Sequence, residues 1–91
     1  MNKKYIKTTS KSPLPTRTDF LKDVVSQLKS RRKDLGLTQE NIDQIMGNSD
    51  RLCSKWECGL STPTGFNLYC WAEVLKTKIV IDTNQHQKRS F

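Results

Sequence analysis

Apolar side chains recur at helical spacing in the stretch that follows the first 17 residues of the chain. The repeating positions are Leu21, Val24, Val25 and Leu28. Spacings of three and four residues place such side chains on one face of a helix. Thr18 is a suitable N-cap residue, and glycine is a common C-terminal stop. The pattern predicts a helix that begins at Thr18 and ends near Leu35, followed by Gly36.

Two shorter helices are predicted next, on either side of a glycine turn. Thr38 can cap the first of them, which ends at Gly47. Its apolar stripe comprises Ile42, Ile45 and Met46. Ser49 can cap the second, which extends to about Glu57. Its inward face carries Cys53 and Trp56, three residues apart.

Residues 64–76 carry a broad apolar surface, which predicts a fourth helix with a face wider than one small core needs. Its members are Phe66, Leu68, Tyr69, Trp71, Ala72 and Leu75. Residues 77–82 then form a β-branched run that is too short for a helix and suited to a strand. Because no second strand is recognisable, this strand either pairs with the same segment of a second copy, which we favour, or packs on the chain's own helices.

The charge is concentrated at the two ends of the chain. The 91 residues fit one domain and carry a formal net charge of +7. Residues 1–18 hold five Lys and Arg and no acid, residues 83–91 hold Lys88 and Arg89, and residues 19–82 hold nine bases and nine acids. We therefore expect a flexible basic arm at 1–17, a neutral folded domain at 18–82 and a disordered basic tail at 83–91. The ends serve either a polyanionic partner or simple solubility.

The residue types argue against several classes of protein. Cys53, Cys58 and Cys70 are odd in number and lack a C-x-x-C pair, and His86 is the single histidine, so we expect neither a disulfide scaffold nor a metal site. Reduced thiols indicate a cytoplasmic protein. No apolar run approaches the roughly 20 residues of a membrane helix. Nothing resembles a nucleotide loop or a nucleophile with its base, so we expect no enzyme and no cofactor.

The two short helices have the spacing of a helix-turn-helix, in which the second helix is shaped for the major groove of DNA. Ile42 and Met46 point into the angle between the helices, and Cys53 and Trp56 bury the back of the second helix. This arrangement leaves four polar side chains facing outward, where they can reach base edges or phosphates. They are Asp50, Arg51, Ser54 and Lys55.

The motif Leu28-x-x-Arg31-Arg32-Lys33-x-x-Gly36-Leu37-Thr38-Gln39, followed by Gly47 and Ser54-Lys55-Trp56-Glu57-x-Gly59, resembles the Cro/repressor (XRE-like) helix-turn-helix family over roughly residues 20–76. The resemblance implies an all-α fold, a compact four- to five-helix, lambda-repressor-like bundle with a short C-terminal strand. It also implies a DNA-binding surface in which Thr38 and Gln39 hold a phosphate and the edge of the site. The recognition residues would be Asn48, Ser49, Asp50, Arg51, Ser54 and Lys55. Arg32 and Glu57 match a structural ion pair of the family.

Two positions depart from the family pattern. Asp43 stands where a small residue such as alanine is usual, and Asn48 replaces an apolar residue in the turn. A buried carboxylate without a partner would be costly, so we expect Asp43 either to face solvent or to bond a neighbouring backbone amide.

The leading interpretation is a sequence-specific regulator of transcription, a repressor that binds a palindromic operator in double-stranded DNA as a homodimer. The expected dimer contacts are Trp71, Ile79, Val80 and Ile81. Lys11 and Arg17 could reach the minor groove from the arm, although a plain extension is equally consistent with the sequence. The alternative, favoured by a resemblance to HipB-like antitoxins, is a module that binds a partner protein such as a toxin and its own promoter secondarily.

Overall fold

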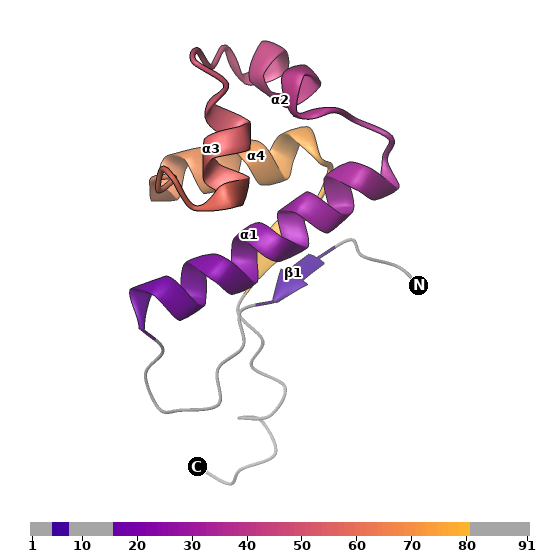
Figure 1. Cartoon of the computed structure of the whole chain (residues 1–91). Coiled ribbons are helices and arrows are strands. Elements are labelled where there is room, and N and C mark those ends of the chain that lie inside the picture. Colours follow the sequence, from indigo (N-terminus) through magenta and orange to yellow (C-terminus); the bar gives the residue numbers. More distant parts are fainter. Residues whose placement is uncertain (1–4, 8–15, 81–91) are drawn as a thin grey trace, which may run out of the picture.

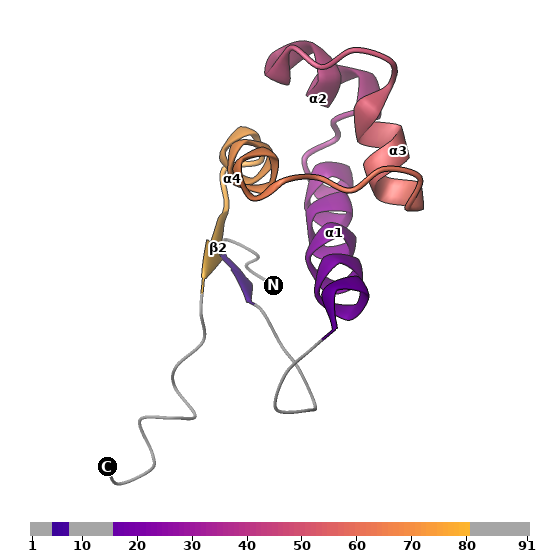
Figure 2. The same ribbon diagram turned by 90° about the vertical axis from the view of Figure 1, so that its left-hand side faces the viewer.

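The structure is a computed structural model that describes residues 5–7 and 16–80. In chain order the elements are β1 (Tyr5–Lys7), α1 (Arg17–Asp34), α2 (Gln39–Met46), α3 (Leu52–Cys58), α4 (Gly65–Val74) and β2 (Lys78–Val80). The long helix α1 runs under the shorter helices, and α2 and the two strands lie toward opposite ends of the molecule (Figures 1 and 2). The predicted class, a small helical bundle with a short C-terminal strand, is confirmed.

The start of α1 lies slightly earlier than its sequence predicts. The Thr16 hydroxyl accepts a hydrogen bond from the Asp19 amide at 3.0 Å, so Thr16 is the N-cap and the prediction of Thr18 was wrong. Arg17 is consequently the first residue of a helix rather than part of an arm, and its side chain is exposed. Lys11 lies outside the described residues.

The start of α3 lies later than expected, and Ser49 is not its N-cap. Asp50 and Arg51 adopt left-handed φ angles of 57° and 52°, which extend the turn until the helix begins at Leu52. The N-cap residue, Arg51, makes no capping bond with its side chain. In α2 the buried face follows Ile42 and the half-buried Met46. Ile45 is 60% exposed, so the prediction that it belongs to this apolar stripe was wrong.

The core is formed where the four helices meet. Its buried members are Val24, Val25, Leu28, Ile42, Cys53, Trp56, Leu68, Trp71, Ala72 and Leu75. The rings of Trp56 and Trp71 lie 5.2 Å apart between centroids and tilt by 33°, a favourable aromatic contact. Because Trp71 is fully buried within its own chain, the expectation that it forms a dimer contact was wrong.

The C-terminal strand has a partner within the same chain. β1 and β2 pair in parallel with Tyr5 opposite Lys78, Ile6 opposite Ile79 and Lys7 opposite Val80. The expectation that the chain offers no second strand, and that all of residues 1–17 form an arm, was therefore wrong for Tyr5–Lys7. A parallel pair needs a long crossover connection, which the helical domain supplies. Ile79 and Val80 are half-buried, and Ile81 lies outside the described residues.

The apolar surface of α4 is divided between the core and solvent. Leu68, Trp71 and Ala72 face inward, whereas Phe66 and Tyr69 are 71% and 59% exposed. The two exposed rings stack with their centroids 6.3 Å apart. The face is thus wider than the core requires, as the sequence predicts.

Candidate nucleic-acid interface

The N-terminus of α2 is fixed by a reciprocal capping box. The Thr38 hydroxyl accepts from the Asn41 amide at 3.0 Å, and the Thr38 amide donates to the Asn41 side-chain oxygen at 2.9 Å. This arrangement satisfies two backbone donors at once and makes the first turn rigid. Thr38 is exposed, and its hydroxyl proton remains free to donate to a phosphate.

The turn between α2 and α3 depends on Gly47, whose φ of 73° closes α2 in the left-handed conformation. The Asn48 amide then donates to the backbone oxygen of Asp43 at 2.8 Å. The Asn48 side chain also turns inward, and its Nδ2 donates to the Asp43 carboxylate at 3.0 Å. Asn48 therefore supports the turn, a role that differs from the recognition role expected for it.

The starts of α2 and α3 face a common shallow hollow on the surface. Four of the predicted DNA-binding residues meet there, together with Glu40 and Asp43: they are Thr38, Gln39, Arg51 and Ser54. The remaining expected residues lie nearby on the chain but outside the lining, with Ser49 and Asp50 exposed and Lys55 half-buried. The hollow is thus a polar surface built from both short helices.

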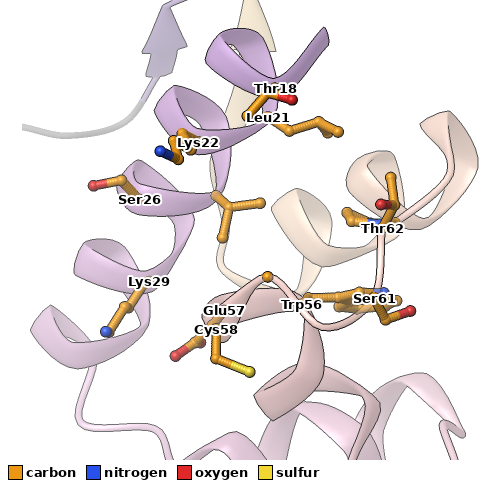
Figure 3. A pocket seen from close by; sticks show the side chains of 13 residues that line it. Thr18, Leu21, Lys22, Ser26, Lys29, Trp56, Glu57, Cys58, Ser61 and Thr62 are labelled. Carbon is orange, nitrogen blue, oxygen red and sulfur yellow. The ribbon is translucent and has the colours of Figure 1, made fainter.

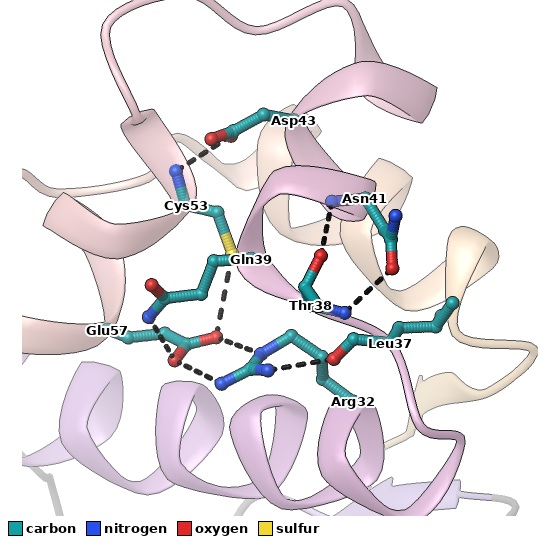
Figure 4. A network of polar contacts seen from close by, with 8 residues as sticks. All are labelled: Arg32, Leu37, Thr38, Gln39, Asn41, Asp43, Cys53 and Glu57. Atoms are coloured by element: carbon teal, nitrogen blue, oxygen red, sulfur yellow. Dashed lines mark hydrogen bonds and ion pairs between the residues drawn. The ribbon is translucent and has the colours of Figure 1, made fainter.

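Behind this hollow, a polar network ties α1 to α2 and α3 (Figure 4). The Arg32 guanidinium donates to both carboxylate oxygens of Glu57, at 2.7 and 2.9 Å, and to the Leu37 backbone oxygen at 2.8 Å. Gln39 Nε2 donates to Glu57 at 2.9 Å. The ion pair implied by the family resemblance is present, with side chains only 9% and 2% exposed. Gln39 is held by this network at the edge of the hollow.

A model of the helix-turn-helix family matches residues 28–81, which is more than half of the chain. The chain belongs to this Cro/repressor-type helix-turn-helix family. The match includes both short helices, the turn and the network, and it identifies the chain as a DNA-binding protein of the regulator class. Comparison with curated proteins and with solved structures gave no match.

The network in this helix-turn-helix shifts the protonation equilibria of its members. Burial alone would raise the pKa of Glu57, but hydrogen bonds from Arg32 and Gln39 outweigh burial and hold that pKa below its usual value. The hydrogen bond to Glu57 raises the pKa of Arg32. Burial, together with the Glu57 charge, raises the pKa of the Cys53 thiol to about 12, so that this cysteine stays protonated and unreactive at neutral pH.

The lowered pKa of Glu57 predicts a loss of stability in acid. A group whose pKa is lower in the folded state stabilises the fold above its unfolded pKa, 4.5 here, and this contribution disappears as the pH falls through the folded value. We expect the urea concentration at the unfolding midpoint to decrease as the pH is lowered below about 4.5. In Glu57→Gln this decrease with pH should be less steep. If the midpoint depends on pH equally steeply in the wild type and in Glu57→Gln, the assignment of this pH dependence to Glu57 is wrong.

The surface of the helix-turn-helix is not rich in positive charge. Between residues 38 and 57 the sequence has four acids, Glu40, Asp43, Asp50 and Glu57, and two bases, Arg51 and Lys55. Arg32 compensates Glu57, but Arg51 and Lys55 are the cations left to meet phosphates from these two helices. The sequence prediction did not include Glu40 or Asp43 among the residues of the site. The available signal was their position one and four residues after Gln39.

Arg31 and Arg32, near the end of α1, are engaged in contacts within the protein. Arg31 Nε donates to the Leu75 backbone oxygen at 2.9 Å and so completes the C-terminus of α4. Since Arg32 is held by Glu57, both arginines are structural. A separate groove of about 430 Å³ lies between α1 and the loop that follows α3, with Lys22, Lys29 and Cys58 among its lining residues (Figure 3). None of the predicted DNA-binding residues lines it.

Within residues 5–7 and 16–80, no cluster of side chains has the composition of a metal site. Cys53, Cys58 and Cys70 are all free thiols. None of the helices in this part of the chain is long and apolar enough to cross a membrane.

Proposed function

We propose that this protein is a cytoplasmic, sequence-specific transcriptional repressor that binds a palindromic operator in double-stranded DNA as a homodimer. The observation that carries the proposal is the hollow between α2 and α3, where Thr38, Gln39, Arg51 and Ser54 converge on one surface. Hydroxyl and amide groups at the start of α2 suit phosphate contacts, and a long cation at the start of α3 suits a base edge or a second phosphate.

The small size of one recognition helix supports the dimer in this proposal. A single short recognition helix reads only a few base pairs, and helix-turn-helix dimers read two half-sites about 34–36 Å apart. The exposed pair Phe66 and Tyr69 on α4 supplies apolar surface for a contact between copies, in place of the buried Trp71. Ile79 and Val80 already belong to a strand paired within the chain, so they are weaker candidates.

Removing either cation from the recognition helix is expected to weaken DNA binding without unfolding the protein. Arg51 is exposed and Lys55 is half-buried, and neither side chain belongs to the core. Arg51→Ala and Lys55→Ala should each lower the affinity for the operator by about 1–3 kcal/mol if they contact bases. Fluorescence anisotropy with a labelled duplex measures this loss, and thermal unfolding monitors the fold.

Lys22→Ala provides the matched control, because it removes the same charge from an exposed helical position on α1, away from the hollow. Its affinity should remain close to that of the wild type. If Arg51→Ala and Lys55→Ala both bind the operator with unchanged affinity, the assignment of α3 as the recognition helix is wrong.

The proposal as a whole is tested by selecting duplexes from a random pool at physiological salt, with the molar mass of the protein measured in parallel. We expect enrichment of a palindrome and the mass of a dimer. Sequence-independent binding that weakens steeply with salt would instead reflect the basic ends of the chain. That result would contradict the repressor and favour a module that binds a partner protein.

A further inference from the structure

The recognition helix α3 has no capping side chain of its own. Its N-cap residue, Arg51, has a left-handed φ of 52° and makes no capping bond through its side chain. The first amides of a helix lack partners within the helix and require another acceptor. The acceptor for the Cys53 amide, in the first turn of α3, comes from a different helix.

That acceptor is Asp43 on α2. Its Oδ1 atom accepts the Cys53 amide at 2.9 Å and Asn48 Nδ2 at 3.0 Å (Figure 4 shows the first of these bonds). The Asn48 amide also donates to the Asp43 backbone oxygen at 2.8 Å. The carboxylate is thus bonded to the turn on one side and to α3 on the other, and its negative charge lies where the helix dipole favours an anion.

This geometry accounts for the two departures from the family pattern with one device. The carboxylate of Asp43, in place of a small residue, reaches across the turn, and the amide of Asn48, in place of an apolar residue, holds that carboxylate in position. A capping residue normally precedes its helix directly and fixes only the local backbone. A cap that comes from the preceding helix also fixes how the two helices are oriented.

We propose that Asp43 is a positioning residue for DNA recognition, which sets the start of α3 relative to α2 and thereby aims Arg51 and Lys55. The proposal rests on the function proposed above. Asp43 also lines the hollow beside Arg51 and Ser54, so the device lies directly at the surface that would meet DNA. Asn48 acts through Asp43 rather than on the DNA.

The bond itself can be tested on the free protein, without DNA. Hydrogen exchange at the Cys53 amide, followed by NMR, should be faster in Asp43→Ala than in the wild type, by about five- to tenfold beyond the change at other α3 amides. Asp43→Asn retains an acceptor oxygen and should restore slow exchange. An unchanged Cys53 amide in Asp43→Ala would overturn the proposal, whether or not the protein binds DNA.

The consequence for recognition is tested with the selected duplex, at a temperature where each variant is folded. Asp43→Ala should lose about tenfold in affinity, Asn48→Ala less, and Asp43→Asn little. The same Asp43→Ala change should cost less in an Arg51→Ala background, because one of the two misaimed side chains is already absent. Equal losses in both backgrounds would show that Asp43 acts only on stability and would overturn the positioning role.

Should Asp43→Ala fail to fold, Asn48→Ala carries the test, because it removes the bond that holds the carboxylate, together with a weak contact to Met46, and leaves the Asp43 acceptor for Cys53 in place. The loss of DNA affinity caused by Asn48→Ala should again be smaller in the Arg51→Ala background. A wild-type protein that selects no duplex would defeat the proposed function alone, since the exchange measurement at Cys53 would still report on the cap.

Discussion

Replacing Trp56 by alanine is expected to destabilise the domain by about 3–5 kcal/mol, enough to unfold much of it. The indole is 3% exposed and contacts Trp71 in the centre of the core, so its removal leaves a cavity that the short helix α3 cannot close. Because α3 contributes to the core through this residue and Cys53, the recognition surface should be lost together with the fold. Urea unfolding followed by circular dichroism measures the loss.

Phe66→Ala is the matched control for that variant. It also removes an aromatic ring, but from a side chain that is 71% exposed on α4. The free energy of unfolding of the monomer should change by no more than about 0.5 kcal/mol. If Trp56→Ala and Phe66→Ala have the same free energy of unfolding, Trp56 is not packed in the core as described.

Truncating Arg32 is expected to cost about 3–5 kcal/mol, because Arg32→Ala strands the Glu57 carboxylate in a nearly dry site. Two hydrogen bonds to Glu57 and one to the Leu37 backbone are lost at the same time. The loss should appear as a lower urea midpoint with an unchanged slope. Lys33→Ala removes the same charge from the next, exposed position and should have little effect.

The double variant Arg32→Met with Glu57→Leu separates the cost of the stranded charge from the value of the pair. Replacing both partners by apolar groups of similar size is often nearly neutral, so the double variant should be more stable than Arg32→Ala alone. Part of the loss in stability will remain, because the Leu37 backbone oxygen and the Gln39 side-chain amide lose their hydrogen-bond partners in the double variant. If the double variant is as unstable as the sum of its single changes, the two side chains are not coupled.

The parts of the fold that the sequence predicts are those set by local chemistry. Thr38 caps α2 because its hydroxyl needs only the amide three residues ahead, and Gly47 ends the helix because glycine adopts the left-handed conformation at little cost. The ion pair of Arg32 and Glu57 could be located because the family resemblance supplied a contact that spacing alone does not reveal.

The parts that the sequence did not predict depend on contacts between distant residues. Ser49 resembles an N-cap, but Asp43 already provides the acceptor for α3, so the chain continues through Asp50 and Arg51 before the helix begins. Tyr5–Lys7 has only three residues and no alternation, and its pairing with β2 depends on the position to which the helices bring both segments. Trp71 was wrongly expected at a dimer contact because apolar residues surround it on α4 in both directions, and this pattern does not distinguish a core from an interface.

The pairing of β1 with β2 affects when the fold can be completed during synthesis. The two strands are separated by roughly seventy residues, so their contact closes a large loop. Because closing this loop costs the chain conformational entropy, we expect the strand pair to be among the last contacts to form. On the ribosome β1 emerges first, and it has no partner until β2 has been made. The helices can associate before that moment, whereas the two strands can pair only after the chain has been translated through Val80.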